Sequence, residues 1–259
     1  LLVPCSSVKG IIMLIRDITA YLESVAPLSL QEDYDNAGLI AGNPSWECSG
    51  ILCTLDVTEE VIEEAINKKC NCIVAHHPLI FRGLKKINGR NAVERAVIAA
   101  IKNDIAIYAS HTNIDNVIHG VNGRIADKIG LSDRMVLDPK PAVLKKLFTF
   151  VPVAYMDKVR DALFAAGAGH VGNYSECSFI HTGTGTFKPG EGTNPFSGTQ
   201  GLRQNEEETK LEVILPAYNE RQVIKALVES HPYEEVAYDL VDLANTHQGT
   251  GAGLIGTIG

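Results

Sequence analysis

The stretch C-I-V-A-H-H-P at residues 72–78 decides the fold, because a short apolar run ends directly in two imidazoles. A continuous apolar run of this length is typical of a strand that is covered on both faces, as in a parallel sheet. Open α/β sheets bind their ligands at the carboxyl ends of the strands, which is where His76 and His77 follow. The stretch therefore predicts both a central strand and a functional edge.

Strands and helices alternate on both sides of this stretch. Before it, an amphipathic helix over 14–25 ends at Pro27, residues 51–55 predict a strand, and Thr58 is the N-cap of a helix over 59–69. After it come a helix over 92–103, a strand over 105–109 and a helix over 122–129 that Gly130 closes. This order predicts a mixed, largely parallel sheet with helices on its faces, an α/β fold.

A second module follows the proline-containing segment 138–141, which is typical of a linker. Strands are expected at 147–152, 174–181, 211–215 and 237–243, with helices at 156–166 and 220–230, the order of a ferredoxin-like fold. The polar stretch 183–209 is too long for an ordinary hairpin and is either a disordered insertion or a binding loop. We expect residues 13–140 and 246–259 in the first domain and 144–245 in the second.

Charge and composition narrow the class of protein. The net charge of −8 gives no electrostatic reason to expect nucleic acid as a partner. Basic residues cluster at Arg82, Lys85, Lys86 and Arg90, as either a solvated loop or a contact for an anionic substrate. No run reaches about 18 apolar residues, so no membrane span is expected. The six cysteines lack a C-x-x-C pair, which favours reduced thiols and a cytoplasmic protein.

Residues 1–12 lack the basic start and the continuous apolar core of a secretory signal. They are either an upstream extension or a start-site artefact, because a well-formed amphipathic pattern begins only at Met13.

A metal site is the chemistry that these residues favour. Adjacent histidines point to opposite sides of an extended chain, so His76 and His77 suit two different ions. His111 and Asp115 follow the next predicted strand and should reach the same edge. Imidazoles with a carboxylate suit Zn, Mn, Fe or Co. The alternative is that these histidines are packed core residues.

Two further groups of polar residues accompany these histidines. Residues 32–36 gather three acids and an amide, including Asp35 and Asn36, and form either part of the site or an Asx-capped turn. Asp56 ends the first strand, where it either reaches the functional edge or caps the following helix.

Several motifs together resemble the dinuclear metal centre protein family. They are D-Y-D-N-A-G-L at 33–39, L-D-V-T at 55–58, A-H-H-P-L-I-F at 75–81 and H-T-N-I-D at 111–115. Bacterial members are labelled GTP cyclohydrolase 1 type 2 homologues, and the eukaryotic namesake is NGG-one-interacting factor three. T-G-T-G-T-F-K-P-G-E-G at 182–192 and H-P-Y-E-E-V-A-Y-D at 231–239 are similar to the PII-like or CutA-like domain inserted in the longer bacterial members.

The resemblance implies roles for individual residues. His76, His77 and Asp115 correspond to metal ligands, and His111 lies near them either as a support behind the ligands or as an alternative ligand. Asp35, Asn36 and Asp56 are candidates for supporting positions beside this set. His231 belongs to the inserted module and is expected to be structural or a contact of that module. The family completes its site with a C-terminal His-x-x-x-Glu segment that is not found here, so we expect a C-terminally truncated chain that alone binds metal weakly or aggregates.

The resemblance also implies a function. We expect two divalent metal ions in the full-length protein, which would activate water against a small nucleotide-like or phosphorylated substrate, as in a GTP cyclohydrolase-like hydrolase. The alternative is a non-catalytic metal-handling or regulatory protein in which the PII-like module senses a ligand or mediates assembly. A homohexamer of the full-length protein is expected in either case.

Overall fold

A computed structural model describes residues 12–259, so the expectation for the N-terminal extension lies almost wholly outside the described part. The chain divides into two compact units. Unit 1 comprises the chain up to Asp138 together with Gly249–Gly259, and unit 2 is Pro139–Gln248. Each unit has its own sheet and its own core.

A four-stranded mixed sheet forms the centre of unit 1, with the order β1-β4-β3-β2. Strands β2, β3 and β4 are parallel to one another, and β1 pairs antiparallel with β4. Their bounds are Gly38–Ala41 (β1), Ile51–Thr54 (β2), Cys72–Ala75 (β3) and Ala106–Ala109 (β4). The expected mixed, largely parallel sheet is therefore confirmed.

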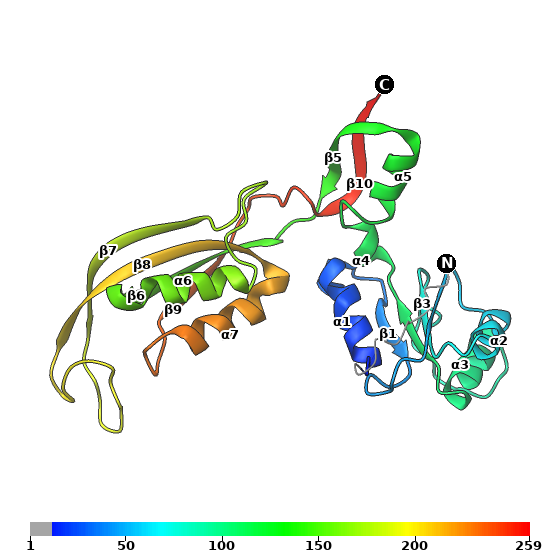
Figure 1. The fold of residues 1–259 in the computed structure, drawn as a ribbon, viewed down its shortest axis with the longest axis horizontal. Coiled ribbons are helices and arrows are strands. Elements are labelled where there is room, and N and C mark those ends of the chain that lie inside the picture. Colours follow the sequence, from blue (N-terminus) through cyan, green and yellow to red (C-terminus); the bar gives the residue numbers. More distant parts are fainter. Residues whose placement is uncertain (1–11) are drawn as a thin grey trace. The chain divides into compact units, whose positions relative to one another are not determined.

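Helices cover both faces of this sheet, as the continuous apolar strands predict. Ile73 and Ile107 pack against α2 and α3, whereas Cys72 and Ala106 face Ile15 of α1. Figure 1 shows α1 on one side of the strands and the α2–α3 pair on the other. The helices of unit 1 are α1 (Ile15–Val25), the 3-10 turn η1 (Leu28–Leu30), α2 (Glu59–Asn67), α3 (Ala92–Lys102), α4 (Thr112–Asp115) and α5 (Val121–Ile129).

Local capping signals explain where these helices begin and end. The Thr58 side chain accepts a hydrogen bond from the backbone amide of Val61 at the start of α2, and Asn91 does the same for Glu94 in α3. Gly130 ends α5 in the left-handed conformation, with φ of 72°. The expected Thr58 and Gly130 caps are both confirmed.

The segment 138–141 is not simply a linker, because its first two residues end a strand. Strand β5 (Leu131–Pro139) pairs with β10 (Gly251–Ile258) as a two-stranded ribbon of unit 1. The hydroxyl of Ser132 bonds the carbonyl of Thr257, while Leu137 lies against Gly253, so the strands run in opposite directions. Pro139 is tolerated because it is the last residue of an edge strand.

Unit 2 has the ferredoxin-like topology that the sequence predicts. Its antiparallel sheet has the order β7-β8-β6-β9, and helices α6 and α7 pack against it. The elements are β6 (Leu144–Pro152), η2 (Val153–Tyr155), α6 (Met156–Ala165), β7 (Ser178–Phe187), β8 (Gln204–Pro216), η3 (Ala217–Asn219), α7 (Glu220–Ser230) and β9 (Tyr238–Asp242). Leu147, Leu163 and Leu227 are fully buried between these layers.

The sequence suggested that the polar stretch 183–209 is a single insertion or loop, and this expectation is wrong. Its two ends extend β7 and β8, with Gly183 opposite Glu208 and Phe187 opposite Gln204. Only 188–203 remains as a connecting loop. The glycine and threonine residues here lack a buried face, so the apolar alternation that identifies a strand is missing from this part of the sequence.

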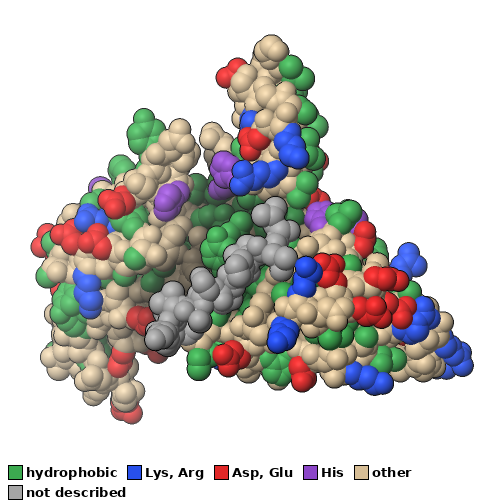
Figure 2. Space-filling view, turned by 45° about the vertical axis from the view of Figure 1, so that its right-hand side comes forward, with side chains coloured by type: hydrophobic (Ala, Val, Ile, Leu, Met, Phe, Trp, Pro, Cys, Tyr) green, Lys and Arg blue, Asp and Glu red, His purple; other side chains and the backbone are tan. Residues whose placement is uncertain are grey.

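The surface of the described residues carries mixed charge. On the face drawn in Figure 2, acidic and basic side chains are interspersed. Over residues 12–259, no helix has the length and apolar character needed to cross a membrane. The cysteines of the described part are free thiols: Cys48, Cys53, Cys70, Cys72 and Cys177.

Candidate metal centre

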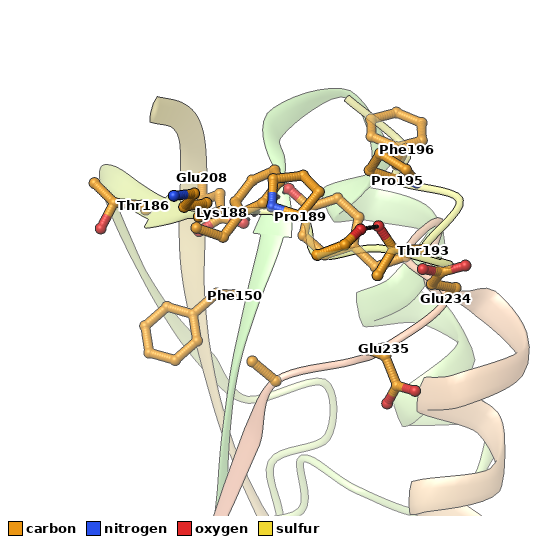
Figure 3. A pocket seen from close by; sticks show the side chains of 15 residues that line it. Phe150, Thr186, Lys188, Pro189, Thr193, Pro195, Phe196, Glu208, Glu234 and Glu235 are labelled. Atoms are coloured by element: carbon orange, nitrogen blue, oxygen red, sulfur yellow. Dashed lines mark hydrogen bonds between the residues drawn. The ribbon is translucent and has the colours of Figure 1, made fainter. Parts of the chain in front are cut away.

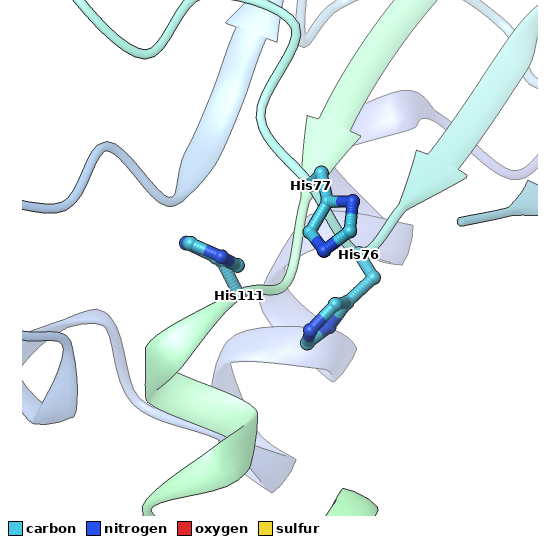
Figure 4. Close-up of side chains that lie close together, drawn as sticks. All are labelled: His76, His77 and His111. Carbon is cyan, nitrogen blue, oxygen red and sulfur yellow. The ribbon is translucent and has the colours of Figure 1, made fainter. Parts of the chain in front are cut away.

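Three histidine side chains converge at the carboxyl edge of the unit 1 sheet. His76, His77 and His111 each offer a ring nitrogen, and these atoms lie within 4.8 Å of one another. The ring centroids are 5.0 to 5.6 Å apart, and Figure 4 shows the three rings close together beyond the strand ends. Three imidazoles at this separation can bind one divalent cation.

The register of two parallel strands explains this convergence. Ala75 of β3 pairs with Ala109 of β4, so the residues that follow leave the sheet side by side. The backbone amide of His76 still bonds Thr54, and that of Ser110 bonds Ala75, which continues the hydrogen-bond ladder past the strand ends. The sequence expectation that both clusters emerge at the same edge agrees with this geometry.

Each histidine ring is held by a hydrogen bond at the same nitrogen. The Nδ1 atom lies 3.0 Å from the Ser110 carbonyl in His76, 2.7 Å from Asp56 in His77 and 2.7 Å from Asp35 in His111. An acceptor at Nδ1 favours the tautomer that carries the proton there and leaves a lone pair on Nε2. All three Nε2 atoms are therefore prepared as donors for a metal ion.

Asp115 lies at the rim of the histidine triad. The short helix α4 starts directly after His111 and turns the chain so that an Asp115 carboxylate oxygen lies 3.9 Å from His76 Nε2. Its side chain is 35% exposed, which leaves room for it to move onto an ion. Its role as a metal ligand remains a prediction, and its position is compatible with it.

Asp35 is the buried anchor of the centre, and its side chain is fully excluded from solvent. Burial opposes ionisation, but hydrogen bonds from the Thr112 hydroxyl, the His111 ring and the backbone amides of Asn36 and Thr112 keep the pKa of Asp35 below its ordinary value. The carboxylate therefore remains ionised at neutral pH. A negative charge against His111 makes that imidazole a stronger donor to a cation.

Asn36 and Asp56 occupy different places. Asp56 stands behind His77 and is exposed, as expected for a residue at the end of β2. The amide of Asn36 instead donates to the backbone oxygen of Ile80, 2.6 Å away. Asn36 thus joins the acidic turn to the segment after the double histidine, and its side chain is not hydrogen-bonded to the triad.

Two exposed aromatic residues that sequence reasoning missed flank the triad. The ring of Phe81 lies 6.3 Å from that of His111, and Tyr34 lies 6.4 Å from Phe81 on the other side. Both are more than 40% exposed, Phe81 at 45% and Tyr34 at 68%. The sequence does not distinguish these rings from core aromatics, because their exposure beside a polar cluster is visible only in the structure. The neighbouring basic residues Arg82, Lys85 and Lys86 are also exposed.

His231 belongs to unit 2 and is not part of the triad. Its Nδ1 accepts from the backbone amide of Tyr233 at 3.1 Å, and its Nε2 lies 3.0 Å from the carbonyl of Phe150. The side chain is buried, and both ring nitrogens are used. This arrangement agrees with the expected structural role.

Comparison with known proteins identifies relatives over nearly the whole chain. A family model described as Duf34/NIF3 (NGG1p interacting factor 3) matches residues 13–257. The chain is 48% identical over 242 residues to a GTP cyclohydrolase 1 type 2 homolog of Halalkalibacterium halodurans, covering 93% of this chain and 65% of the relative. A Bacillus subtilis protein of the same name is 42% identical over 244 residues, covering 94% and 65%.

Among solved structures, a Bacillus cereus protein related to NIF3 is 46% identical with a TM-score of 0.83, covering 95% of this chain and 66% of that one. A Staphylococcus aureus protein is 29% identical with a TM-score of 0.62, covering 92% and 62%. The chain spans 65% of the length of the first two curated relatives. The second structure supports the same arrangement of strands and helices at lower identity.

Proposed function

The chain belongs to the Duf34/NIF3 (NGG1p interacting factor 3) family, and from this membership we propose that it is a metal-dependent, hydrolase-like protein. His76, His77 and His111 would hold a divalent ion, and Asp115 would complete its ligands or accept a proton beside it. The names of the relatives include a GTP cyclohydrolase homologue, so a small nucleotide-like or phosphorylated compound is the substrate class that we propose.

The single observation that carries this proposal is the shared hydrogen bonding of the three rings. Each Nδ1 has a carbonyl or carboxylate acceptor, which favours a lone pair on each Nε2, and one ring nitrogen of each residue lies within 4.8 Å of the others. Histidines that only pack in a core are not expected to have the same Nδ1-protonated tautomer in three neighbouring rings. Nitrogen donors with one carboxylate fit Zn, Fe, Mn or Co better than Ca or Mg, which prefer oxygen.

A divalent ion bound there would polarise a substrate oxygen and lower the pKa of a coordinated water. The residues of the chain would do the rest. Asp115 would accept a proton at the rim, and the support for this role is that its carboxylate lies 3.9 Å from His76 Nε2 and is partly exposed. Tyr34 and Phe81 would stack on a flat ring of the substrate, and Arg82 and Lys85 would attract its phosphates.

We propose that the full-length protein binds two divalent metal ions. The triad and Asp115 together supply four donor atoms, which suits one tetrahedral ion. A second ion, bridged to the first, would need further donors. The measured number of ions per chain, for this chain and for a whole-length relative, separates the two cases.

The second candidate is a non-catalytic metal-handling or regulatory protein. Its support is that unit 2 has a separate core and a cavity of about 470 Å³, large enough for a small molecule. Such a module can report a ligand without taking part in chemistry. Metal transfer to an acceptor without turnover would favour this candidate.

The deciding experiment combines metal analysis with turnover. The chelated protein is reloaded with Zn, Mn, Fe or Co, and bound metal and GTP consumption are measured for the wild type, His76→Ala, His77→Ala and the control His181→Ala, an exposed residue of β7. We expect the two triad variants to lose metal and turnover together while the control keeps both. Full metal binding by both triad variants would refute the proposed centre.

A further inference from the structure

Unit 2 contains a cavity of about 470 Å³ that is separate from the histidine triad. It lies between the far end of the β7–β8 arm with its connecting loop and the segment between α7 and β9 (Figure 3). This volume is within the range of small-molecule sites, about 300 to 1,000 Å³. No role for it follows from the metal chemistry of unit 1.

Aromatic rings form much of the wall. The ring centroid of Tyr233 lies 5.7 Å from that of Phe196 and 6.2 Å from that of Phe187. Behind Phe196, the ring of Tyr155 stands at 90° to it with a centroid distance of 5.4 Å. Phe150 lines the opposite side of the cavity from Glu234 and Glu235 (Figure 3). The wall therefore presents ring faces and edges to an occupant.

A nearly buried carboxylate lies against this wall. Glu208 is only 9% exposed, and within the described residues its carboxylate accepts one hydrogen bond, from the Tyr233 hydroxyl at 2.8 Å. Burial and this carboxylate raise the pKa of Tyr233, so the hydroxyl remains protonated and donates at neutral pH. No lysine or arginine of the described chain forms an ion pair with Glu208. A buried negative charge without a cation is costly, which favours a cationic occupant.

Gly185 makes room for that carboxylate. A Cβ atom at position 185 would collide with the carboxylate of Glu208, so the side chain occupies the space above the glycine. Two more acids, Glu234 and Glu235, line the cavity, whereas Lys188 is the only basic residue among the lining residues that the structure describes. The lining thus has an excess of negative charge.

The connecting loop is tied down by specific contacts. Glu234 accepts the backbone amide of Asn194 with both carboxylate oxygens, at 2.9 and 3.1 Å. Ser197 donates to Glu206 at 2.7 Å, and Gln200 donates to the carbonyl of Thr193 at 2.7 Å. These contacts fix Phe196 and its neighbours, so the cavity is formed before a ligand arrives.

We propose that this cavity binds a small organic cation, with a protonated amine on a flat apolar body. The amine would pair with Glu208, and the flat body would lie among Phe187, Phe196 and Tyr233. Aromatic faces attract cations as well as apolar rings, so both parts of the ligand find complementary surface. A simple anion is excluded by the acidic lining, and an inorganic cation would leave the aromatic wall unused.

Three indole compounds that differ in charge test the proposal by titration calorimetry on the whole chain at low salt. Tryptamine is the cation, tryptophol the neutral analogue and indole-3-acetate the anion. We expect saturable 1:1 binding of tryptamine, weaker binding of tryptophol and none of indole-3-acetate. Glu208→Gln should weaken tryptamine binding by about tenfold or more and leave tryptophol unchanged. Phe196→Ala should weaken both ligands.

The matched control is Glu207→Gln, which makes the same charge change on an exposed neighbour in β8 outside the cavity. If Glu208→Gln does not fold, the exposed lining residue Glu235 provides the variant Glu235→Gln, for which we expect a loss of about twofold to threefold for tryptamine only. The proposal is overturned if tryptamine shows no saturable binding, if tryptophol or indole-3-acetate binds as tightly, or if Glu207→Gln has the effect expected of Glu208→Gln.

Discussion

The Nδ1 atom of His111 lies 2.7 Å from a carboxylate oxygen of Asp35, although the two residues are 76 positions apart in the sequence. The Asp35 side chain is fully buried and also accepts from the hydroxyl and the backbone amide of Thr112. One carboxylate therefore fixes both the ring of His111 and the start of α4, which carries Asp115. The acidic turn and the histidine edge form a single structural unit.

Asp35→Asn should lower metal affinity by about 10-fold to 100-fold, because the substitution removes the negative charge behind His111 while nearly keeping the shape. Titration calorimetry of the chelated protein with Zn²⁺ or Mn²⁺ measures this change. Asp33→Asn is the control, since Asp33 is exposed in the same turn. Equal affinities for the two variants would contradict the role of Asp35.

Much of unit 1 could be predicted from local signals. Residues 92–103 were expected as a helix, and α3 covers Ala92–Lys102. This helix could be predicted because the spacing of its apolar residues is visible within a single segment of sequence. The convergence of His76, His77 and His111 could be predicted as well, since parallel neighbouring strands present their carboxyl ends at one edge.

Other features depend on contacts between distant residues and left no local signal. Asp35 is buried because His111 and Thr112, which are distant in the sequence, pack against it. The sequence of the turn around Asp35 does not indicate these contacts. The pairing of β5 with β10 joins segments more than a hundred positions apart, and Pro139 and Pro141 obscured the strand. Most of β7 is exposed, so no apolar face marks it in the sequence.

Tyr108→Phe should raise the free energy of unfolding by about 1 kcal/mol, because a buried hydroxyl without a partner costs stability. Tyr108 is fully buried, and no group of residues 12–259 hydrogen-bonds its hydroxyl. Urea denaturation measures the change. Tyr21→Phe, at a residue that is 69% exposed, should stay within about 0.5 kcal/mol of the wild type. A clear loss of stability in Tyr108→Phe would show that the hydroxyl has a partner.

Unit 2 should lose stability as the pH falls below about 6.5, the ordinary pKa of histidine. Burial lowers the pKa of His231, against smaller opposing effects from the Phe150 carbonyl and Glu208. Between the lowered pKa and 6.5 the unfolded chain binds more protons than the folded chain, so the stabilisation is complete above 6.5 and declines towards the lowered pKa. Protonation at Nδ1 would also break its bond with the Tyr233 amide.

Calorimetric unfolding between pH 5 and 7.5 measures this dependence, and His231→Gln is the comparison. Burial also lowers the pKa of His247, which contributes with the same sign, so the difference between the wild type and the variant isolates His231. The variant should be less stable at pH 7.5 and should show a flatter profile. An unchanged slope in His231→Gln would contradict the assignment.

Gly42→Ala should destabilise unit 1 by about 1 to 3 kcal/mol. Gly42 has φ of 103°, and a Cβ there would lie 2.6 Å from the Cα of Ala106 on β4. Both the backbone conformation and the close approach exclude a side chain. Gly83→Ala is the control, since a Cβ at Gly83 would meet no atom within 4 Å, and it should change urea denaturation little. Similar midpoints for the two variants would argue against the close contact.

The pairing of β5 with β10 has a consequence for how the chain can be modified. The strand that leads out of unit 1 and the strand that leads back lie side by side, so the points where unit 2 is attached are neighbours in space. Closing a loop costs free energy that grows only slowly with its length. We therefore expect that unit 2 can be replaced by a short turn, or by another folded module, while the strand order of the sheet that carries the histidines stays the same.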